Sequence, residues 1–500
     1  YWLVAVSLRL FGPHEFAARL PSALAATLSV ALTYWYGRKR FGQRAALIGG
    51  AFLAVAPVFV GAARLATTDA LLVMFVTAAV LSLHAASTTQ VAWRWSAVAG
   101  VFCGLGVLTK GAPGVVLPIV TYCLWLLLRR SGTSKARRAP SLPGTMLLTL
   151  MVAAVVAVPW HITAWRVNGD AFVREYVLRQ HIERFRGGDR SHRAPTWFFV
   201  PAFLIGFFPG SAFALGGMFA RRTPACEVDR HDGPGGSDTQ ETRLLLQTWF
   251  WVTFVLFSLG GSKLVSYILP LYPAAALIAG DWVAQRRPQK ALSRPLVLGI
   301  LTAMAVLLLL ISALLYPQPV VDLVQRYADR PLVLDGHSRE LLREAAALTA
   351  ILIGSLAAFV LLLRLRGTDA AVGGLVGGSA LFIVAAVLIA VPRVESESVG
   401  SLHRLARRAG HMVTSHGMLS IAIGSPRRPS VYFYLPETVL SEQRVQEVPV
   451  DDLESAQVPD GTLVLTRSTW RPSEQYGSYT PVLTEHDYAL WRVERERVTD

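Results

Sequence analysis

Long apolar runs recur along the chain, and short polar stretches separate them. Most runs have the length that an α-helix needs to cross a bilayer, roughly 17–25 residues. The pattern predicts about twelve spans, and residues 1–11 are too short to span and predict a helix lying at the interface. The expected spans are 17–36, 43–63, 69–87, 94–109, 112–128, 145–165, 197–219, 244–260, 264–283, 295–316, 341–363 and 372–391.

The connections between these runs fall into two sets by charge. If the spans alternate in direction, five connections rich in lysine and arginine lie on one side, which the positive-inside rule makes the cytoplasm. They begin at Arg38, Arg129, Arg221, Arg286 and Arg364. The other side then holds Asp69, Lys110, Lys263 and the long connection 166–196, so these polar groups are expected to converge on the outer face.

The end of the chain has a different pattern. Residues 403–410 predict a helix, and residues 418–424, 430–435 and 462–468 predict strands separated by turn residues. We therefore expect a transmembrane domain over residues 1–392 and a small α/β domain over 393–500 on the periplasmic side. The predicted fold class is an all-α polytopic membrane protein with this one extramembrane domain.

Composition supports the membrane assignment. Of the 500 residues, 53% are hydrophobic and 16% are charged, which is unusual for a soluble protein of this size. The net charge of +15 is explained by the basic cytoplasmic connections, so nucleic acid is not an expected partner. The three cysteines form neither a disulfide framework nor a metal-binding spacing.

The segment GGSKLVSYILPLYP, residues 260–273, places a lysine at the outer end of a predicted span. If the segment is α-helical, Lys263 and Tyr267 share one face, and the two donors could grip a lipid phosphate. The alternative is that Lys263 extends to the headgroups and Tyr267 belongs to the aromatic belt.

Two further polar residues are expected beside this segment. Asp69 begins a span, where its carboxylate could cap the helix N-terminus or contact an acceptor or a sugar amine. Lys110 lies in the tight turn of LTKGAPGVVLP, which Gly111 and Gly114 keep compact, and it could contact a substrate or extend to the headgroups.

The long connection breaks the charge rule, because it carries seven arginines on the expected outer side. An anionic ligand would explain them, with Arg184 and Arg186 as candidate phosphate ligands. The alternative is an amphipathic helix on the membrane surface. His181 is a tentative ligand for a divalent metal, although the sequence itself requires no cofactor and contains no metal motif such as HExxH.

Five stretches in order resemble a known family: ARLATTDALL, LTKGAPGVVLP, HIERF, WFFVPAFLIGFFPG and SKLVSYILPLYPAAALIAG. They are similar to the bacterial protein-mannosyltransferase-like superfamily of GT-C glycosyltransferases, in particular to the branch with lipid A 4-amino-4-deoxy-L-arabinose transferases. The resemblance covers nearly the whole chain. It implies transfer of a sugar from an undecaprenyl-phosphate donor to lipid A or another envelope acceptor, at the periplasmic face of the bacterial inner membrane.

In that family the catalytic acid lies in the first external loop, which would precede Tyr1 here. The resemblance therefore implies thirteen spans in a full-length protein, and the chain is expected to be a fragment or to have lost activity. The donor-phosphate candidates are Arg184, Arg186, Lys263 and Tyr267, because cationic donors stabilise a phosphate leaving group. Asp69 matches a second acidic position of the family.

Other functions stay open at this point. A lipid-sugar transporter would have many spans, but its polar sites usually lie near the bilayer midplane. A protein O-mannosyltransferase or a cell-wall glycosyltransferase would share the same fold, and a non-enzymatic assembly partner would lack the catalytic loop.

Overall fold

The computed structural model describes most of residues 1–285 and parts of the remainder. The described residues are 1–129, 142–176, 178, 194–219, 236–285, 354–355, 359, 368–387, 408–409, 412, 419–423, 445–449, 462–467, 478–485 and 488–494. The chain divides into two compact units, Tyr1–Ile383 and Val384–Asp500.

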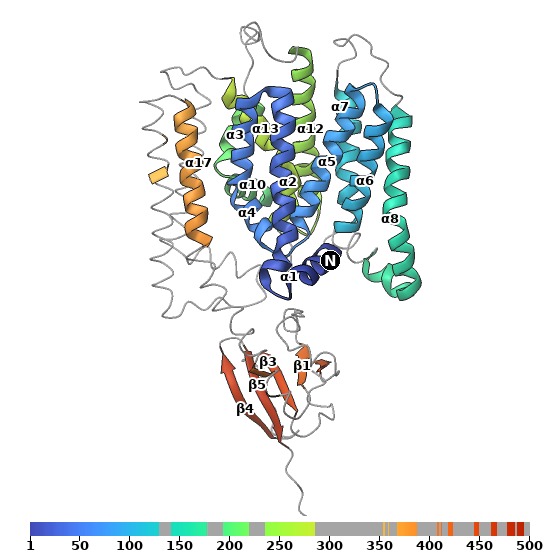
Figure 1. The fold of residues 1–500 in the computed structure, drawn as a ribbon, viewed down its shortest axis with the longest axis vertical. Coiled ribbons are helices and arrows are strands. Elements are labelled where there is room, and N and C mark those ends of the chain that lie inside the picture. The colour runs from blue at the N-terminus through green and yellow to red at the C-terminus, as the bar shows by residue number, and fades with distance from the viewer. Residues whose placement is uncertain are drawn as a thin grey trace, which may run out of the picture. The chain divides into compact units, whose positions relative to one another are not determined.

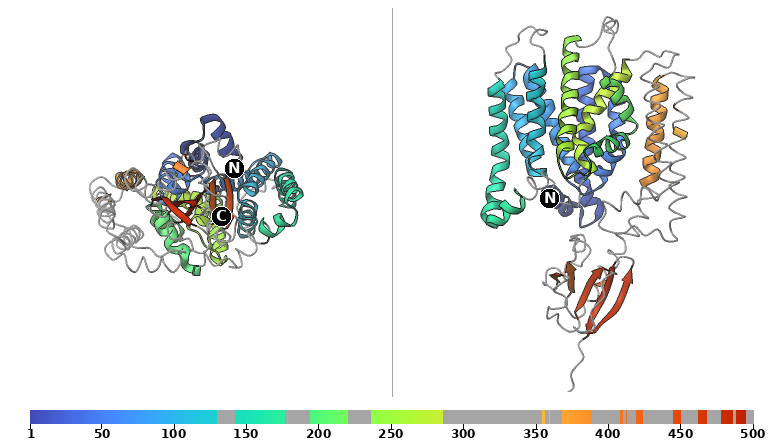
Figure 2. Two further views of the ribbon diagram at one scale, coloured as in Figure 1. Left: turned by 90° about the horizontal axis from the view of Figure 1, so that it is seen from below. Right: turned by 180° about the vertical axis from the view of Figure 1, so that it is seen from behind.

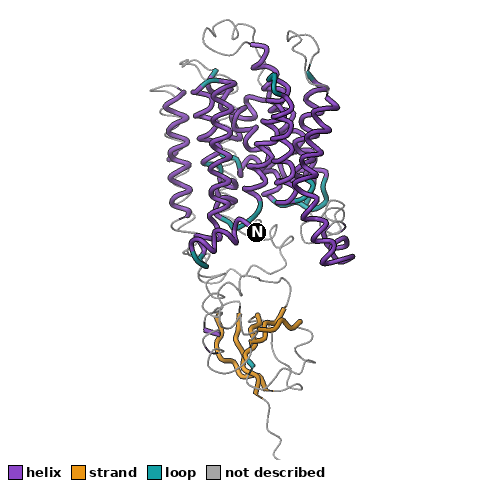
Figure 3. Tube along the Cα trace, turned by 45° about the vertical axis from the view of Figure 1, so that its right-hand side comes forward, coloured by secondary structure: helices purple, strands orange, loops and turns teal. Residues whose placement is uncertain are grey.

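The first unit is helical (Figures 1 and 3). Its helices are α1 (Trp2–Phe11), α2 (Glu15–Phe41), α3 (Gln43–Ala54), α4 (Pro57–Arg64), α5 (Asp69–Thr88), α6 (Ala92–Lys110), α7 (Pro113–Leu128), α8 (Leu142–Phe172), η3 (Thr196–Phe198), α10 (Phe199–Gly206), α11 (Gly210–Phe219), α12 (Gly236–Leu259), η5 (Val265–Leu271), α13 (Tyr272–Ala284) and α17 (Thr368–Ala385).

The apolar runs coincide with helices wherever the structure describes them. Among the described residues, six helices are long and apolar enough to cross a membrane, and two bent pairs bring the number to eight. The chain is therefore a multi-span helical membrane protein. The expected spans 295–316 and 341–363 lie almost wholly outside the described residues, so the count of twelve stays a prediction.

Two expected spans are broken rather than continuous, which corrects the prediction. Residues 43–63 form α3 and α4, which meet at 62°, because Pro57 cannot donate a backbone hydrogen bond and holds Ala56 in an extended conformation. Residues 197–219 form η3 with α10 and then α11, bent by 117° around Phe207–Pro209. Apolar periodicity did not reveal either bend.

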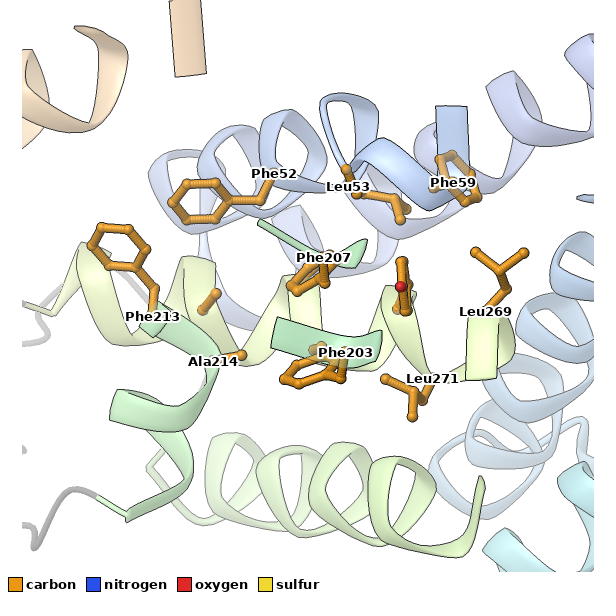
Figure 4. Close-up of a cluster of buried hydrophobic side chains, with 14 of the residues drawn as sticks. Phe52, Leu53, Phe59, Phe203, Phe207, Phe213, Ala214, Leu269 and Leu271 are labelled. Atoms are coloured by element: carbon orange, nitrogen blue, oxygen red, sulfur yellow. The ribbon is translucent and has the colours of Figure 1, made fainter. Parts of the chain in front are cut away.

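Helix α13 lies at the centre of the first unit, and α8 lies at its edge (Figures 1 and 2). In the span Val265–Ala284, 89% of the most apolar 18-residue stretch is buried. For the span Pro143–Tyr176, which includes most of α8, the buried share is 22%. Phenylalanines from separate parts of the chain pack around this central span, among them Phe52, Phe203 and Phe207 (Figure 4). Helix α8 packs mainly on α6 and leaves most of its apolar surface free for lipid.

Helix α1 is ten residues long, too short to cross a bilayer, and it lies crosswise to α2 (Figure 1). Its apolar side chains Trp2, Leu3, Val6 and Leu10 are exposed. This arrangement agrees with the interfacial helix that the sequence predicts for residues 1–11.

The described strands all belong to the second unit. They are β1 (Leu419–Ile423), β2 (Val445–Pro449), β3 (Leu463–Arg467), β4 (Ser478–Glu485) and β5 (Tyr488–Glu494), in the sheet order β2-β1-β3-β5-β4. Strand β1 is parallel to β2 and β3, whereas β5 is antiparallel to β3 and β4. The expected strands 418–424 and 462–468 coincide with β1 and β3, whereas 430–435 and most of the helix 403–410 lie outside the described residues.

Candidate functional site

Asp69 and Lys110 form an ion pair between two neighbouring helices. Asp69 is the first residue of α5 and Lys110 is the last residue of α6, so the antiparallel pair brings both side chains to the same end. The Lys110 ammonium donates a hydrogen bond to Asp69 Oδ1. The expected side-chain cap by Asp69 is absent, because Thr68 occupies the N-cap position without a side-chain cap and the Asp69 carboxylate turns to Lys110.

The turn after Lys110 is compact, as the glycines predict. Gly111 has φ of 74°, a conformation that favours glycine, and its N–H donates to the Val107 carbonyl. A side chain at Gly114 would have its Cβ only 2.2 Å from the carbonyl carbon of Gly106. The start of α7 therefore lies directly against α6, and this contact fixes the end of α6 that carries Lys110.

Tyr267 lies in η5 and is held from two sides. The Lys110 ammonium is 5.1 Å from the centroid of its ring, within the range of a cation–π contact, and the Phe257 ring is 5.5 Å away between centroids. Within the described part of the chain the Tyr267 hydroxyl makes no hydrogen bond. The phenol ring is therefore fixed while its hydroxyl remains able to donate to a ligand.

Lys263 lies in the connection between α12 and η5, and its side chain is buried with 6% of the residue exposed. Its ammonium donates to the Gly260 carbonyl at 2.5 Å, and no described carboxylate lies within ion-pair distance. Burial lowers the pKa of the Lys263 amine. A buried ammonium without a counter-ion is costly, so this position is suited to receive an anion.

The expected relation of Lys263 and Tyr267 needs a correction. Residues 265–271 form a 3-10 helix and Lys263 precedes it, so the two residues do not share one α-helical face. Tyr267 is instead linked to Lys110 from α6. Asp69, Lys110 and Tyr267 are joined by these contacts, and Lys263 precedes Tyr267 by four residues in the chain. We call these four residues the lysine cluster.

The long connection begins with an aromatic cluster that the sequence analysis did not identify. Near the end of α8 the helix is kinked at Gly169, and Phe172 and Tyr176 fold back beside Trp160 and His161, with the Phe172 and Tyr176 rings stacked at 5.0 Å. Tyr176 donates a hydrogen bond to His161 Nε2 at 3.1 Å, since Nδ1 donates to the Ala157 carbonyl. The adjacent Trp160–His161 and the four-residue spacing of Phe172 and Tyr176 are the signals that could have revealed it.

Three predicted site residues, His181, Arg184 and Arg186, lie outside the described residues and stay predictions. Within the described ranges, no group of three or more histidine, cysteine, aspartate or glutamate side chains could hold a metal ion. His181 therefore stays the candidate metal ligand of the sequence analysis.

The opposite ends of the helices carry a second set of ion pairs. Arg40 at the end of α2 donates to Asp238 Oδ2 at 2.6 Å and to Thr88 at 3.1 Å. Deeper inside, Arg243 of α12 makes two hydrogen bonds, of 2.5 and 3.0 Å, to the carboxylate of Asp281 in α13. Both of these side chains are about nine-tenths buried, and they line a small cavity of about 50 Å³.

Known proteins resemble this chain in sequence. Residues 1–162 match the family described as dolichyl-phosphate-mannose-protein mannosyltransferase. A relative from Erwinia tasmaniensis, undecaprenyl phosphate-alpha-4-amino-4-deoxy-L-arabinose arabinosyl transferase, is 29% identical over 321 residues, which cover 62% of this chain and 54% of the relative. A protein of the same name from Pseudomonas paraeruginosa is 29% identical over 297 residues, covering 58% and 50%. The chain thus spans about half the length of the curated relatives it matches.

The fold is also found among solved structures. ArnT from Cupriavidus metallidurans bound to undecaprenyl phosphate superimposes with a TM-score of 0.72 at 21% identity, covering 98% of this chain and 86% of that one. Its apo state gives a TM-score of 0.71. The chain therefore has the fold of this protein, and the resemblance that the five sequence motifs indicated is confirmed.

Proposed function

We propose that this protein is an integral membrane glycosyltransferase that transfers a sugar from undecaprenyl phosphate to lipid A or a related envelope acceptor. The observation that carries the proposal is the buried ammonium of Lys263, which has no counter-ion among the described residues. The fold and the names of the relatives support the same reaction. A phosphate headgroup would match this charge while its polyprenyl tail stayed in the bilayer.

The lysine cluster suits the chemistry of such a transfer. An oxygen of the acceptor attacks the anomeric carbon, the bond from that carbon to the phosphate oxygen breaks, and the electron pair leaves with undecaprenyl phosphate. Negative charge therefore grows on the phosphate in the transition state, where the Lys263 ammonium and the Tyr267 hydroxyl can donate hydrogen bonds to it. Arg184 and Arg186 are proposed as further donors. Where the attacking oxygen belongs to a hydroxyl group, the departing phosphate takes up its proton.

A transfer assay tests the proposal. The purified full-length protein in lipid nanodiscs is expected to convert an undecaprenyl-phosphate-linked aminoarabinose and lipid A into modified lipid A, measured by mass spectrometry. The same assay with a mannosyl donor and a peptide acceptor tests the protein-mannosylating alternative. Flipping of labelled donor in liposomes without any transfer would contradict the enzyme proposal and favour a transporter.

We also propose that the lysine cluster faces the periplasm across the bacterial inner membrane, with the second unit on the same side. The charge of the connections supports this orientation, since Arg38, Lys39 and Arg40 at the far end of α2 would then face the cytoplasm.

Cysteine labelling tests the orientation at both ends of α5. Ala66 and Gln90 are exposed at its two ends. In a protein without its native cysteines, the Ala66→Cys variant is expected to react with a membrane-impermeant maleimide in intact spheroplasts, and the Gln90→Cys variant only after permeabilisation. Labelling of both from the same side would contradict the predicted topology.

A further inference from the structure

The two lysines of the cluster differ in how their charge is compensated. Lys110 already has a carboxylate partner in Asp69, whereas Lys263 has only the Gly260 carbonyl among the described residues. A phosphate that approaches the cluster would therefore meet Lys263 as its uncompensated cation. Lys110 is suited to a different role, since its charge is already balanced by the Asp69 carboxylate.

The contacts of Lys110 suggest what that role is. Its ammonium lies between the Asp69 carboxylate and the face of the Tyr267 ring, 5.1 Å from the ring centroid. Phe257 contacts the ring as well, so the phenol has little freedom to rotate away. The two charged groups lie on helix ends rather than on long loops, and the contact between Gly106 and Gly114 braces the end of α6.

We propose that Asp69 and Lys110 are a pair of positioning residues that orient Tyr267, whose hydroxyl then donates to the phosphate of the lipid-linked sugar. This inference rests on the proposed function and adds to it that neither Asp69 nor Lys110 touches the substrate. A donor held in place before the reaction stabilises the developing charge without a reorganisation cost. The ion pair thus acts on the reaction only through the phenol.

A double-mutant cycle with Tyr267 tests this inference. Asp69→Asn and Lys110→Met are each expected to lower kcat by about tenfold, and their combination by about the same factor, because they act as one unit. Tyr267→Phe is expected to lower kcat by a similar factor. In the Tyr267→Phe background, either further substitution should then cost less than about twofold, since the hydroxyl that it positions is gone.

Further variants separate positioning from a general structural effect. Lys110→Arg preserves both contacts and should retain most of the activity. Asp238→Asn breaks the Arg40–Asp238 ion pair at the opposite ends of the helices and serves as a matched control, with an unchanged kcat. A tenfold loss from Asp69→Asn or Lys110→Met that persists in the Tyr267→Phe background would overturn the inference, because the residue would then contact the substrate itself. Wild-type activity in Asp69→Asn would overturn it as well.

The test also separates this inference from the proposed function. Affinity for undecaprenyl phosphate is measured alongside transfer, and Asp69→Asn should weaken it by only a few-fold and only when Tyr267 is present. A wild-type protein that neither binds this lipid nor transfers a sugar overturns the proposed function and the inference with it. A wild-type protein that transfers the sugar, with additive effects across the cycle, overturns the inference alone.

Discussion

Replacement of Lys263 by methionine is expected to lower kcat/KM for sugar transfer by about 10²–10³-fold, because it removes both a preorganised donor and the positive charge that balances the developing anion. The same variant should unfold at a higher temperature than the wild type. Its stability is expected to rise by about 1–2 kcal/mol, because a buried ammonium without a counter-ion is replaced by an apolar side chain of similar length. Transfer assays and thermal unfolding in detergent measure the two effects.

The opposite signs of these effects are the informative part of the Lys263 experiment. A residue that served only the fold would lose stability and activity together. Lys263→Arg should retain part of the activity, because it keeps the charge. Lys39 lies in the last turn of α2, over the Trp35 ring, and away from the lysine cluster. Lys39→Met should therefore leave transfer unchanged. Wild-type turnover in Lys263→Met would exclude Lys263 as a phosphate ligand.

The largest loss of stability is expected from Asp281→Asn, which leaves the buried Arg243 without its counter-ion. Breaking one side of a buried ion pair typically costs about 3–5 kcal/mol. The two hydrogen bonds between Arg243 and the Asp281 carboxylate join α12 to α13, the central helix of the first unit. Denaturation of the purified protein in mixed micelles would measure the loss of unfolding free energy.

Two comparisons make the Asp281 result specific. Asp238→Asn breaks the more exposed pair with Arg40, for which about 1 kcal/mol or less is expected after solvent screening. The double variant Arg243→Met with Asp281→Leu should recover most of the stability, since neither charge is then left buried alone. A single variant as stable as wild type would show that the Arg243 charge finds water or another partner, for example through the small cavity beside it.

The two lysines of the site show how far local pattern predicts a role. Both stand out in the sequence because a charge at the end of an apolar run is costly. The sequence did not predict that Lys110 has a carboxylate partner and Lys263 has none among the described residues. Asp69 is 41 residues from Lys110, and no local pattern pairs the two. The expected α-helical register of Lys263 and Tyr267 was wrong, because the chain from 265 to 271 tightens into a 3-10 helix.

Similar limits apply to Arg243 and Asp281, which the sequence analysis did not select. They lie 38 residues apart in two separate helices, and each alone is an isolated charge near the end of an apolar segment. The bends in the two broken spans were not predicted, for a different reason. Hydrophobicity reports that a segment is apolar, whereas the bends at Pro57 and at Phe207–Pro209 depend on backbone geometry within an equally apolar stretch.

The sequence by itself determined that the chain is a multi-span membrane protein, where most of its helices lie and which fold family it resembles. These properties follow from apolar length and local motifs, because the bilayer requires every span to satisfy its own backbone hydrogen bonds. Only the tertiary structure decided that Lys110 is compensated by Asp69, that Lys263 is not compensated within the described residues, and that Tyr267 is held between Lys110 and Phe257. Charge compensation depends on which helix ends meet in space, and that depends on the packing of the whole helical unit.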